Sequence, residues 1–303
     1  MNAPVTSERT AILAAGLVAV MWGMAGVFVR LLPPASPVAI TAGRLLVALL
    51  VSIPIIAFSA KNRRSLMSSL GRPAAYILAL LLAGYYFLAT IAFQLSPVAE
   101  VALFLSTPPL FVLTFRRLHG DSPLRAEVVG AVVAIVGIML ILAPNIINST
   151  DSGYDRIIGD LLAFASAGLS GLYVYIYRNL AETHNAPDPV GVTFMTFLLG
   201  GVILGVIILS LQIPTGMLYS GNNLLAILGL GIFSTAISST VFAIASKHLP
   251  AVVTATILLL IPVFAGIFAY LILGEKLSPL MIPGGVLVLS GIAMILNLKR
   301  KKA

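Results

Sequence analysis

The sequence predicts an all-α integral membrane protein of ten transmembrane helices, arranged as two inverted five-helix repeats. The first observation is composition: 59% of the 303 residues are hydrophobic and only 9% are charged, whereas a soluble domain carries roughly 25% charged residues. The second is the length of the uncharged runs, because a helix needs about 20 residues to cross the hydrocarbon core of a bilayer. The third is that short motifs of the first half recur, in order, in the second half.

The composition also limits the chemistry and the partners. The chain has no cysteine and only three histidines, which lie far apart in the sequence, so we expect no metal site and no cofactor. The net charge of +8 does not indicate nucleic acid, because most basic residues flank apolar runs and there orient a membrane protein. The expected partners are therefore the lipid bilayer and a small-molecule substrate.

The apolar runs define the spans. Between residues 189 and 246 the chain has no charge at all, and the turn residues Pro214, Thr215 and Gly216 divide this stretch into two helices. The expected spans are 10–29, 37–58, 73–99 continuing into 97–115, 124–143, 158–177, the two halves of 189–246, 250–273 and 279–297.

Lysine and arginine predict the orientation. With the N-terminus inside, fourteen basic residues fall on inner segments and three fall on outer segments (Arg30, Arg156 and Lys276), and Arg44 inside a span completes the 18. This distribution satisfies the positive-inside rule. We therefore expect a multi-pass protein of a bacterial-type inner (plasma) membrane with both termini in the cytoplasm.

The two halves of the chain repeat each other. The segment Trp22–Arg30 in span one aligns with Ser170–Arg178 in span six. The other pairs are Leu95–Ala99 with His248–Val252, Pro109–Phe111 with Pro262–Phe264, and Gly130 and Gly137 with Gly284 and Gly291. The members of each pair stand 148 to 154 residues apart.

Five spans in each repeat is an odd number, so the second repeat must lie upside down relative to the first. Inverted repeats are typical of secondary transporters, whose substrate site lies at the midplane between the halves. A duplicated helical scaffold without transport is the less favoured alternative.

Several short motifs on these spans resemble the EamA branch of the drug/metabolite transporter superfamily. They are Trp22-Gly23, Arg44-Leu45-Leu46, Ser96–Glu100, Lys247–Ala251 and Leu273–Lys276. The resemblance covers two five-helix units, 11–143 and 158–297, with one departure: Ser170 stands in the second unit where the first has Trp22. It implies export of amino acids or related metabolites, a class that includes YddG-like aromatic amino acid exporters, and does not identify the substrate.

Prolines interrupt two matched spans. Pro108 and Pro109 fall in the middle of span four, and Pro262 falls in the middle of span nine. An interior proline removes a helix hydrogen bond and kinks the helix. The carbonyls released in this way are those of Phe104, Leu105 and Leu258. These breaks are either hinges or static packing kinks, and their recurrence in both repeats favours a hinge or gating role.

Two charged residues lie within spans. Arg44 is costly at that depth and so either faces a water-filled interior, where it can bind a substrate carboxylate, or snorkels or pairs with carbonyls. Glu100 lies about one turn into span four, where it either relays a proton or favours the positive end of the helix dipole as a cap, the cap being preferred. No second buried carboxylate is evident in the sequence to pass a proton onward.

Polar and aromatic side chains gather in stripes at helical spacing, such as Thr235, Ser239, Phe242 and Ser246 on one face of span eight. Each stripe indicates either helix–helix hydrogen bonding or a solvated site. Their recurrence in equivalent helices of both halves favours a site for the set as a whole. The residues that we expect to bind substrate are Trp22, Arg44, Tyr86, Thr90, Thr107, Tyr173, Tyr177, Ser239 and Phe242.

We therefore expect a secondary transporter that exports small amphipathic metabolites, foremost amino acids including aromatic ones, by alternating access. The alternatives are a drug or other-metabolite carrier of the same superfamily and a channel-like pore, although no charged ring or repeated carbonyl filter motif is visible. An enzyme is not expected, because no nucleophile–base constellation is present at one depth. The sequence does not indicate an oligomeric state.

Overall fold

Apolar runs form helices in a membrane protein because lipid offers the backbone no hydrogen-bonding partner. The computed structural model describes residues 8–32, 35–120, 124–147, 151–242, 258–276 and 278–297, and all the regular structure within them is helical. The helices are α1 (Glu8–Gly23), α2 (Ala25–Leu31), α3 (Pro37–Ala57), α4 (Ala60–Leu70), α5 (Pro73–Leu95), α6 (Val98–Phe104), α7 (Pro108–Leu118), α8 (Arg125–Ile147), α9 (Asp151–Glu182), α10 (Pro189–Ser210), η1 (Gly216–Tyr219), α11 (Gly221–Gly231), η2 (Ile232–Ile237), α14 (Ile261–Phe268), η3 (Ala269–Leu273) and α15 (Met281–Asn297).

Seven helical segments in the described ranges are long and apolar enough to cross a membrane. They are Leu13–Leu31, Pro37–Ala57, Pro73–Leu95, Val98–Leu118, Tyr154–Glu182, Pro189–Ser210 and Gly221–Phe242. Two shorter apolar helical segments follow, Ile261–Leu273 and Met281–Ile295. The prediction of a multi-span helical membrane protein is confirmed. The first part of expected span nine, 250–257, lies outside the described residues.

Proline and capping residues set where the helices begin. Proline occupies the first turn of α3, α5, α7, α10 and α14, where its missing N–H leaves no hydrogen bond unmade. Asp188 precedes α10, and its Oδ1 accepts a hydrogen bond from the N–H of Val190 at 2.9 Å, as an N-cap does.

One helix was not expected. Helix α4 lies between the second and third spans, and its basic residues Lys61, Arg63 and Arg64 are exposed. Its buried side holds Ser65, whose Oγ accepts a hydrogen bond from the N–H of Gly191 at 3.1 Å. The segment was too polar and too short to be recognised as a span, and its amphipathic pattern is typical of a helix at a membrane surface.

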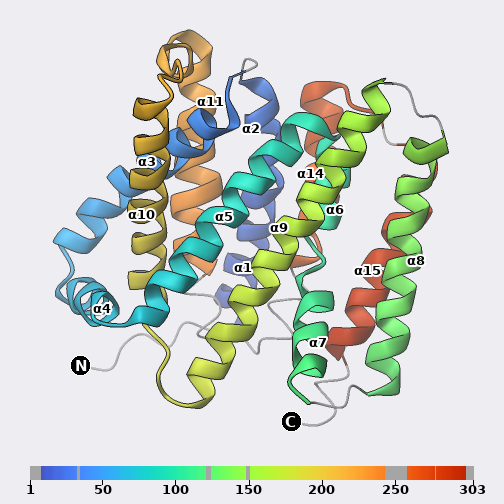
Figure 1. Cartoon of the computed structure of the whole chain (residues 1–303), viewed down its shortest axis with the longest axis horizontal. Coiled ribbons are helices and arrows are strands. Elements are labelled where there is room, and N and C mark those ends of the chain that lie inside the picture. The colour runs from blue at the N-terminus through green and yellow to red at the C-terminus, as the bar shows by residue number, and fades with distance from the viewer. Residues whose placement is uncertain are drawn as a thin grey trace.

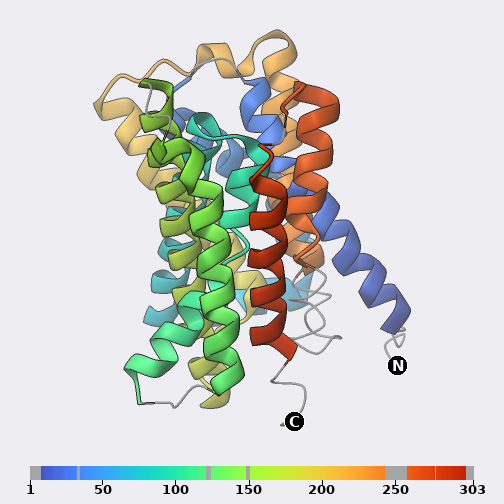
Figure 2. The same cartoon turned by 90° about the vertical axis from the view of Figure 1, so that its right-hand side faces the viewer.

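The spans form one bundle (Figure 1). The start of α1 and the end of α15 lie at the same end of the bundle, which we call the terminal face (Figures 1 and 2). Helix α4 also lies at this face. The end of α2, the start of α6 and the start of α9 lie at the other end, which we call the opposite face.

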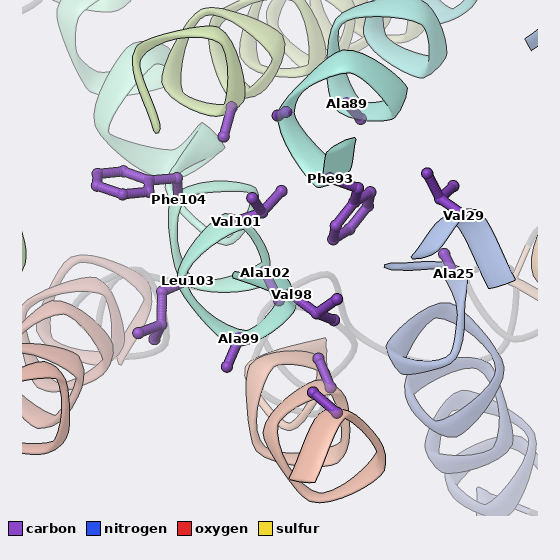
Figure 3. Packing of buried hydrophobic residues seen from close by; sticks show 14 of the residues in the cluster. Ala25, Val29, Ala89, Phe93, Val98, Ala99, Val101, Ala102, Leu103 and Phe104 are labelled. Atoms are coloured by element: carbon purple, nitrogen blue, oxygen red, sulfur yellow. The ribbon is translucent and has the colours of Figure 1, made fainter. Parts of the chain in front are cut away.

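Helix α6 lies in the centre of the largest core. All seven of its residues are buried, and Figure 3 shows its apolar side chains, from Val98 to Phe104, pointing in different directions toward neighbouring helices. Val98, for example, belongs to the same core cluster as Phe93 of α5 and Val29 of α2. Because apart from Glu100 its residues are apolar on every side, this helix belongs in the interior of the bundle.

Helices α8 and α15 pack along their length, side by side in both views (Figures 1 and 2). A Cβ atom on Gly130 would lie 2.7 Å from the carbonyl oxygen of Gly291, and one on Gly137 would lie 2.6 Å from that of Gly284. Only glycine permits such a close backbone approach. Because the earlier residue of α8 meets the later residue of α15, the two helices run antiparallel.

Candidate functional site

A cluster of polar and aromatic residues lies where the two halves of the chain meet. We call α1 to α8 the first half and α9 to α15 the second half. The inter-half cluster joins residues of α1, α3 and α5 to residues of the helical segment Gly221–Phe242. Its members are Trp22, Arg44, Tyr86, Thr235, Ser239 and Phe242.

Arg44 is the centre of the cluster. Its Nε and Nη2 both donate to Thr235 Oγ1, at 3.1 and 3.0 Å, and its Cζ lies 4.6 Å from the centroid of the Tyr86 ring. Only 2% of Arg44 is exposed, so the alternative that it snorkels to the membrane surface is wrong. Instead, a cation of the first half lies against a hydroxyl of the second half.

The remaining contacts of the cluster join the same two halves. Tyr86 and Ser239 share a hydrogen bond of 3.2 Å between their hydroxyl oxygens. The rings of Trp22 and Phe242 lie 5.2 Å apart and are only partly buried. Thr235, Ser239 and Phe242 contact Arg44, Tyr86 and Trp22 respectively, so all three point toward the first half.

A π-helix shapes this part of the second half. Helix η2 carries Thr235, whose hydroxyl donates to the carbonyl of Leu230, five residues earlier, at 2.8 Å. The neighbouring Ser234 donates to the carbonyl of Met21 at 2.7 Å and so ties η2 to α1. Widened π turns within α-helices are frequent at functional sites. Thr235 was in the predicted stripe but not among the predicted binding residues.

Tyr173, Tyr177 and Thr90 were also predicted to bind substrate, but they are not members of the inter-half cluster. Tyr173 and Tyr177 stack on each other on α9, and the Tyr177 hydroxyl donates to the carbonyl of Pro187 at 3.0 Å. Tyr173 also interacts electrostatically with Tyr86. The hydroxyl of Thr90 donates to the carbonyl of Tyr86 within its own helix, at 2.8 Å. These residues lie beside the cluster on α5 and α9, and within the described part of the chain none of them forms a hydrogen bond with Arg44.

The proline breaks are present. Helix α6 ends at Phe104 and α7 begins at Pro108. The prediction that the Phe104 carbonyl is left free is wrong, because both the N–H and the hydroxyl of Thr107 donate to it, at 3.0 and 2.7 Å. In the second half, α14 begins with Pro262 in its first turn.

Charged residues form a second link between the halves, at the opposite face. Glu100 is fully buried and pairs with Arg156 through both carboxylate oxygens, one of them at 2.8 Å from Arg156 Nε. Glu275 lies 3.7 Å from Arg30 Nε and also accepts a hydrogen bond from the N–H of Val98 at 2.9 Å. We call these four residues the opposite-face ion pairs.

These contacts bear on the predicted role of Glu100. Glu100 lies in the first turn of α6, as expected, but the hydrogen bond to the first N–H of this helix is supplied by Glu275. The carboxylate of Glu100 instead binds Arg156 of α9. The sequence did not identify Arg30, Arg156 and Glu275 as partners, because each lies at the end of a different span.

An apolar groove of about 440 Å³ lies apart from the cluster, between α6, α14, η3 and α15. Pro262 borders it, together with the exposed residues Val263, Tyr270 and Val286. Its lining is apolar and faces outward, as expected of a surface that contacts lipid acyl chains. It therefore lacks the polar groups that orient a substrate.

The fold and the inter-half cluster define the class of protein, a helical membrane transporter. A crystal structure of another protein shares this fold, with a TM-score of 0.67 and 21% sequence identity over 97% of this chain and 100% of that one. The family description "EamA-like transporter family" matches residues 9–143 and 157–297. The chain therefore belongs to the EamA-like transporter family, within the drug/metabolite transporter superfamily.

Curated relatives agree with this membership. An uncharacterized transporter of Archaeoglobus fulgidus is 25% identical over 280 residues, which cover 91% of this chain and 92% of the relative. An uncharacterized transporter of Clostridium kluyveri is 27% identical over 200 residues, 64% of this chain and 61% of the relative. The function of the chain is membrane transport, and the relatives come from bacteria and archaea.

Proposed function

We propose that this protein is a secondary carrier that exports small amphipathic metabolites, foremost amino acids including aromatic ones, by alternating access. The inter-half cluster carries the proposal, because three of its four contact pairs join the first half to the second. A substrate bound there would contact both halves, so its binding would be coupled to their relative movement. The rings of Trp22 and Phe242 suit an apolar body, and the hydroxyl of Ser239 and the guanidinium of Arg44 suit a polar head.

We propose further that the chain has ten spans in two inverted repeats. The crosswise contacts of α8 with α15 support this arrangement. So does a reciprocal contact in the kinked spans: a Cβ on Gly23 would lie 2.8 Å from the Cβ of Phe264, and one on Gly171 would lie 2.6 Å from that of Phe111. Gly23 and Gly171 are equivalent in the two repeats, as are Phe264 and Phe111, so each half packs its first span against the kinked span of the other.

The orientation that we propose places the terminal face in the cytoplasm, in the inner membrane of the cell. Reporter fusions at Lys61 and at Asp155 test it. The expected result is cytoplasmic reporter activity at Lys61 and external activity at Asp155. A cytoplasmic signal at Asp155 would overturn the topology.

The kinked spans are the proposed hinges of the transport cycle. Replacing both Pro109 and Pro262 with alanine removes the steric clash by which each proline ring keeps its span from continuing as one helix, so we expect slower transport at little cost in folded protein. Initial rates of flux in liposomes, normalised to the amount of monodisperse protein, provide the measurement. Unchanged flux in the double variant would mean that these prolines are static packing kinks.

Reconstitution tests the substrate assignment. Purified protein in liposomes should move labelled amino acids such as phenylalanine with saturation and counterflow, which separate a carrier from a channel-like pore. Parallel measurements with and without a pH gradient report whether export is coupled to protons. If the protein moves no amino acid but moves a bulky cationic drug or a nucleotide sugar, the protein is a drug or other-metabolite carrier instead.

A further inference from the structure

The partners of Arg44 are all neutral. A guanidinium has five N–H donors, and in Arg44 two of its nitrogens share one acceptor, the hydroxyl of Thr235. The ring face of Tyr86 covers the guanidinium carbon. The phenol side chain of Tyr85, the neighbour of Tyr86 on α5, also lies near the guanidinium. A buried charge normally has an ionic partner, since burial removes its water.

Among the residues that the structure describes, no carboxylate is positioned to pair with Arg44. Of its ten acidic residues, four pair with arginines other than Arg44: Glu100, Glu127, Glu182 and Glu275. Asp188 caps α10, and Asp160 lies beside Arg156. Glu8, Asp151 and Asp155 lie at the starts of α1 and α9, and Asp121 lies between α7 and α8 in the sequence. Within the described residues, no carboxylate lies within ion-pair distance of Arg44.

A second polar group beside Arg44 also lacks a partner. Thr41 lies one turn before Arg44 on α3, is fully buried, and its Oγ1 makes no hydrogen bond to any described residue. Buried hydroxyls are nearly always hydrogen-bonded. An unpaired hydroxyl next to an uncompensated guanidinium is a donor pair that suits a bound anion, because both can donate to the same carboxylate.

From these contacts we infer that the substrate is an amphipathic monocarboxylate whose negative charge neutralises Arg44, and that an amino group on the substrate is dispensable. The substrate has one carboxylate because the single positive charge of the guanidinium neutralises one negative charge. The cluster has no acidic side chain to pair with an ammonium, and the Tyr86 ring face is already covered by Arg44. This inference rests on the proposed function, since it assumes that the inter-half cluster holds the substrate. It restricts the proposed substrates to compounds that carry one carboxylate.

Four ligands with the same phenyl ring distinguish the carboxylate from the ammonium group. L-Phenylalanine carries both, 3-phenylpropionate carries only the carboxylate, and phenethylamine and L-phenylalaninamide carry only the ammonium. Each is added to the purified full-length protein in detergent, and the thermal unfolding midpoint and the dissociation constant are measured. The two ligands with a carboxylate should stabilise the protein, and the two without one should not. Flux of labelled phenylalanine in liposomes is measured in parallel, so that failure of amino acid transport is detected separately.

Variants then test Arg44 itself. Arg44→Gln should bind 3-phenylpropionate at least about tenfold more weakly, the loss expected for a charge-assisted hydrogen bond. Its midpoint without ligand should not fall, because the substitution removes an uncompensated buried charge. Arg44→Lys keeps the charge but loses the planar fork and should bind with intermediate affinity. Leu50→Ala, at a position that is 58% exposed on the same helix, is the matched control and should behave as wild type.

The binding and flux results together support or contradict the inference. Stabilisation by phenethylamine or phenylalaninamide equal to that by 3-phenylpropionate would overturn it, as would stabilisation by phenylalanine alone or by none of the four. Phenylalanine flux with any of these results would leave the proposed function in place. Binding of 3-phenylpropionate without phenylalanine flux would support the inference and count against amino acid export. A lower ligand-free midpoint in Arg44→Gln would show that Arg44 is a structural residue.

Discussion

Two groups of charged residues link the same two halves of the molecule in opposite ways. At the opposite-face ion pairs, Arg30 and Arg156 each meet a carboxylate, and each pair joins a residue of the first half to one of the second. In the inter-half cluster, Arg44 meets only a hydroxyl and a ring. The first group is neutral by itself, so it can close without a ligand. The second keeps an uncompensated charge, which a ligand can neutralise.

This difference assigns different tasks to the two groups in the proposed cycle. A carrier that opens toward the opposite face must separate α2, α6, α9 and η3 there, and the ion pairs must break for this to happen. A carrier that binds its substrate must bring both halves onto it, and the inter-half cluster offers contacts from both. Substitutions in the ion pairs should therefore change stability and the balance between conformations, whereas substitutions in the cluster should change affinity.

The largest effect is expected at the buried acid of the ion pairs. Glu100→Ala leaves Arg156 facing a buried site without its bidentate partner, and breaking a fully buried pair in this way costs roughly 3–5 kcal/mol. Arg156 is 30% exposed and keeps the nearby charge of Asp160. We therefore expect a loss in the free energy of unfolding that approaches this range without exceeding it.

Unfolding in mixed micelles by titration with SDS measures that loss. The matched control is the double variant Glu100→Gln with Arg156→Gln, which removes both charges of the pair and should recover part of the stability. The recovery should be incomplete because the buried Asp160 no longer has the charge of Arg156 beside it. If Glu100→Ala lowers the free energy of unfolding no more than the double variant does, the pair does not hold the opposite face closed.

A smaller effect is expected at the neutral partner of Arg44. Thr235→Val keeps the shape of the side chain but removes the oxygen that accepts from Nε and Nη2, and a hydrogen bond to a charged group is worth about 1.5–3 kcal/mol. The free energy of unfolding should fall by about that amount, and Thr235→Ser should restore it. In an Arg44→Gln background the cost of Thr235→Val should shrink, and an undiminished cost would mean that Thr235 acts through Leu230 alone.

A third substitution tests the aromatic wall of the cluster. Trp22→Ala removes the ring that faces Phe242, and an aromatic contact is worth about 0.5–1.5 kcal/mol beyond area burial. We expect uptake of labelled phenylalanine into inverted vesicles to require several-fold more substrate for half-saturation, with the maximal rate less affected. The Leu50→Ala control should leave both parameters unchanged, and equal effects in the two variants would remove Trp22 from the site.

The positions of the spans follow from the sequence because lipid imposes a simple rule on them. Uncharged runs of sufficient length become helices wherever they occur, and the divide between 189 and 246 is observed as the break that holds η1. Helix α4 follows a different rule: its short amphipathic segment forms a helix at a surface, where the length criterion for spans does not apply. The length rule for spans does not say how far a proline opens a helix. The hydrogen bonds from Thr107 to the Phe104 carbonyl were therefore not predicted.

The pairings in the two charged groups depend on three-dimensional neighbours that are far apart in the chain. Arg44 was recognised because a cation within a span is rare, and Thr235 was placed on the correct helix face by periodicity. That these two meet, 191 positions apart, depends on how α3 packs against η2, which no local pattern encodes. The pairing of Arg30 with Glu275 was not predicted for the same reason: Arg30 was counted only as a charge on an outer segment, Glu275 was named only within a motif, and their pairing requires that two helix ends meet.

The smallest effect is expected at Glu275, the more exposed of the two acidic residues in the ion pairs. Its pair with Arg30 is loose, at 3.7 Å, and the two side chains are 20% and 32% exposed, so the charge interaction should contribute no more than about 1 kcal/mol. Glu275 has a second task, because it accepts the N–H of Val98 at the start of α6, and glutamine can accept the same hydrogen bond through its amide oxygen. Glu275→Gln should therefore lower the free energy of unfolding by less than about 1 kcal/mol, and the difference should shrink further at high salt because exposed charges are screened. Glu275→Ala should cost about 1 kcal/mol more, since it also loses the cap. SDS titrations of both variants at low and high salt give these values, and a salt-independent loss in Glu275→Gln as large as that in Glu100→Ala would mean that the two ion pairs are equivalent and that burial does not rank them.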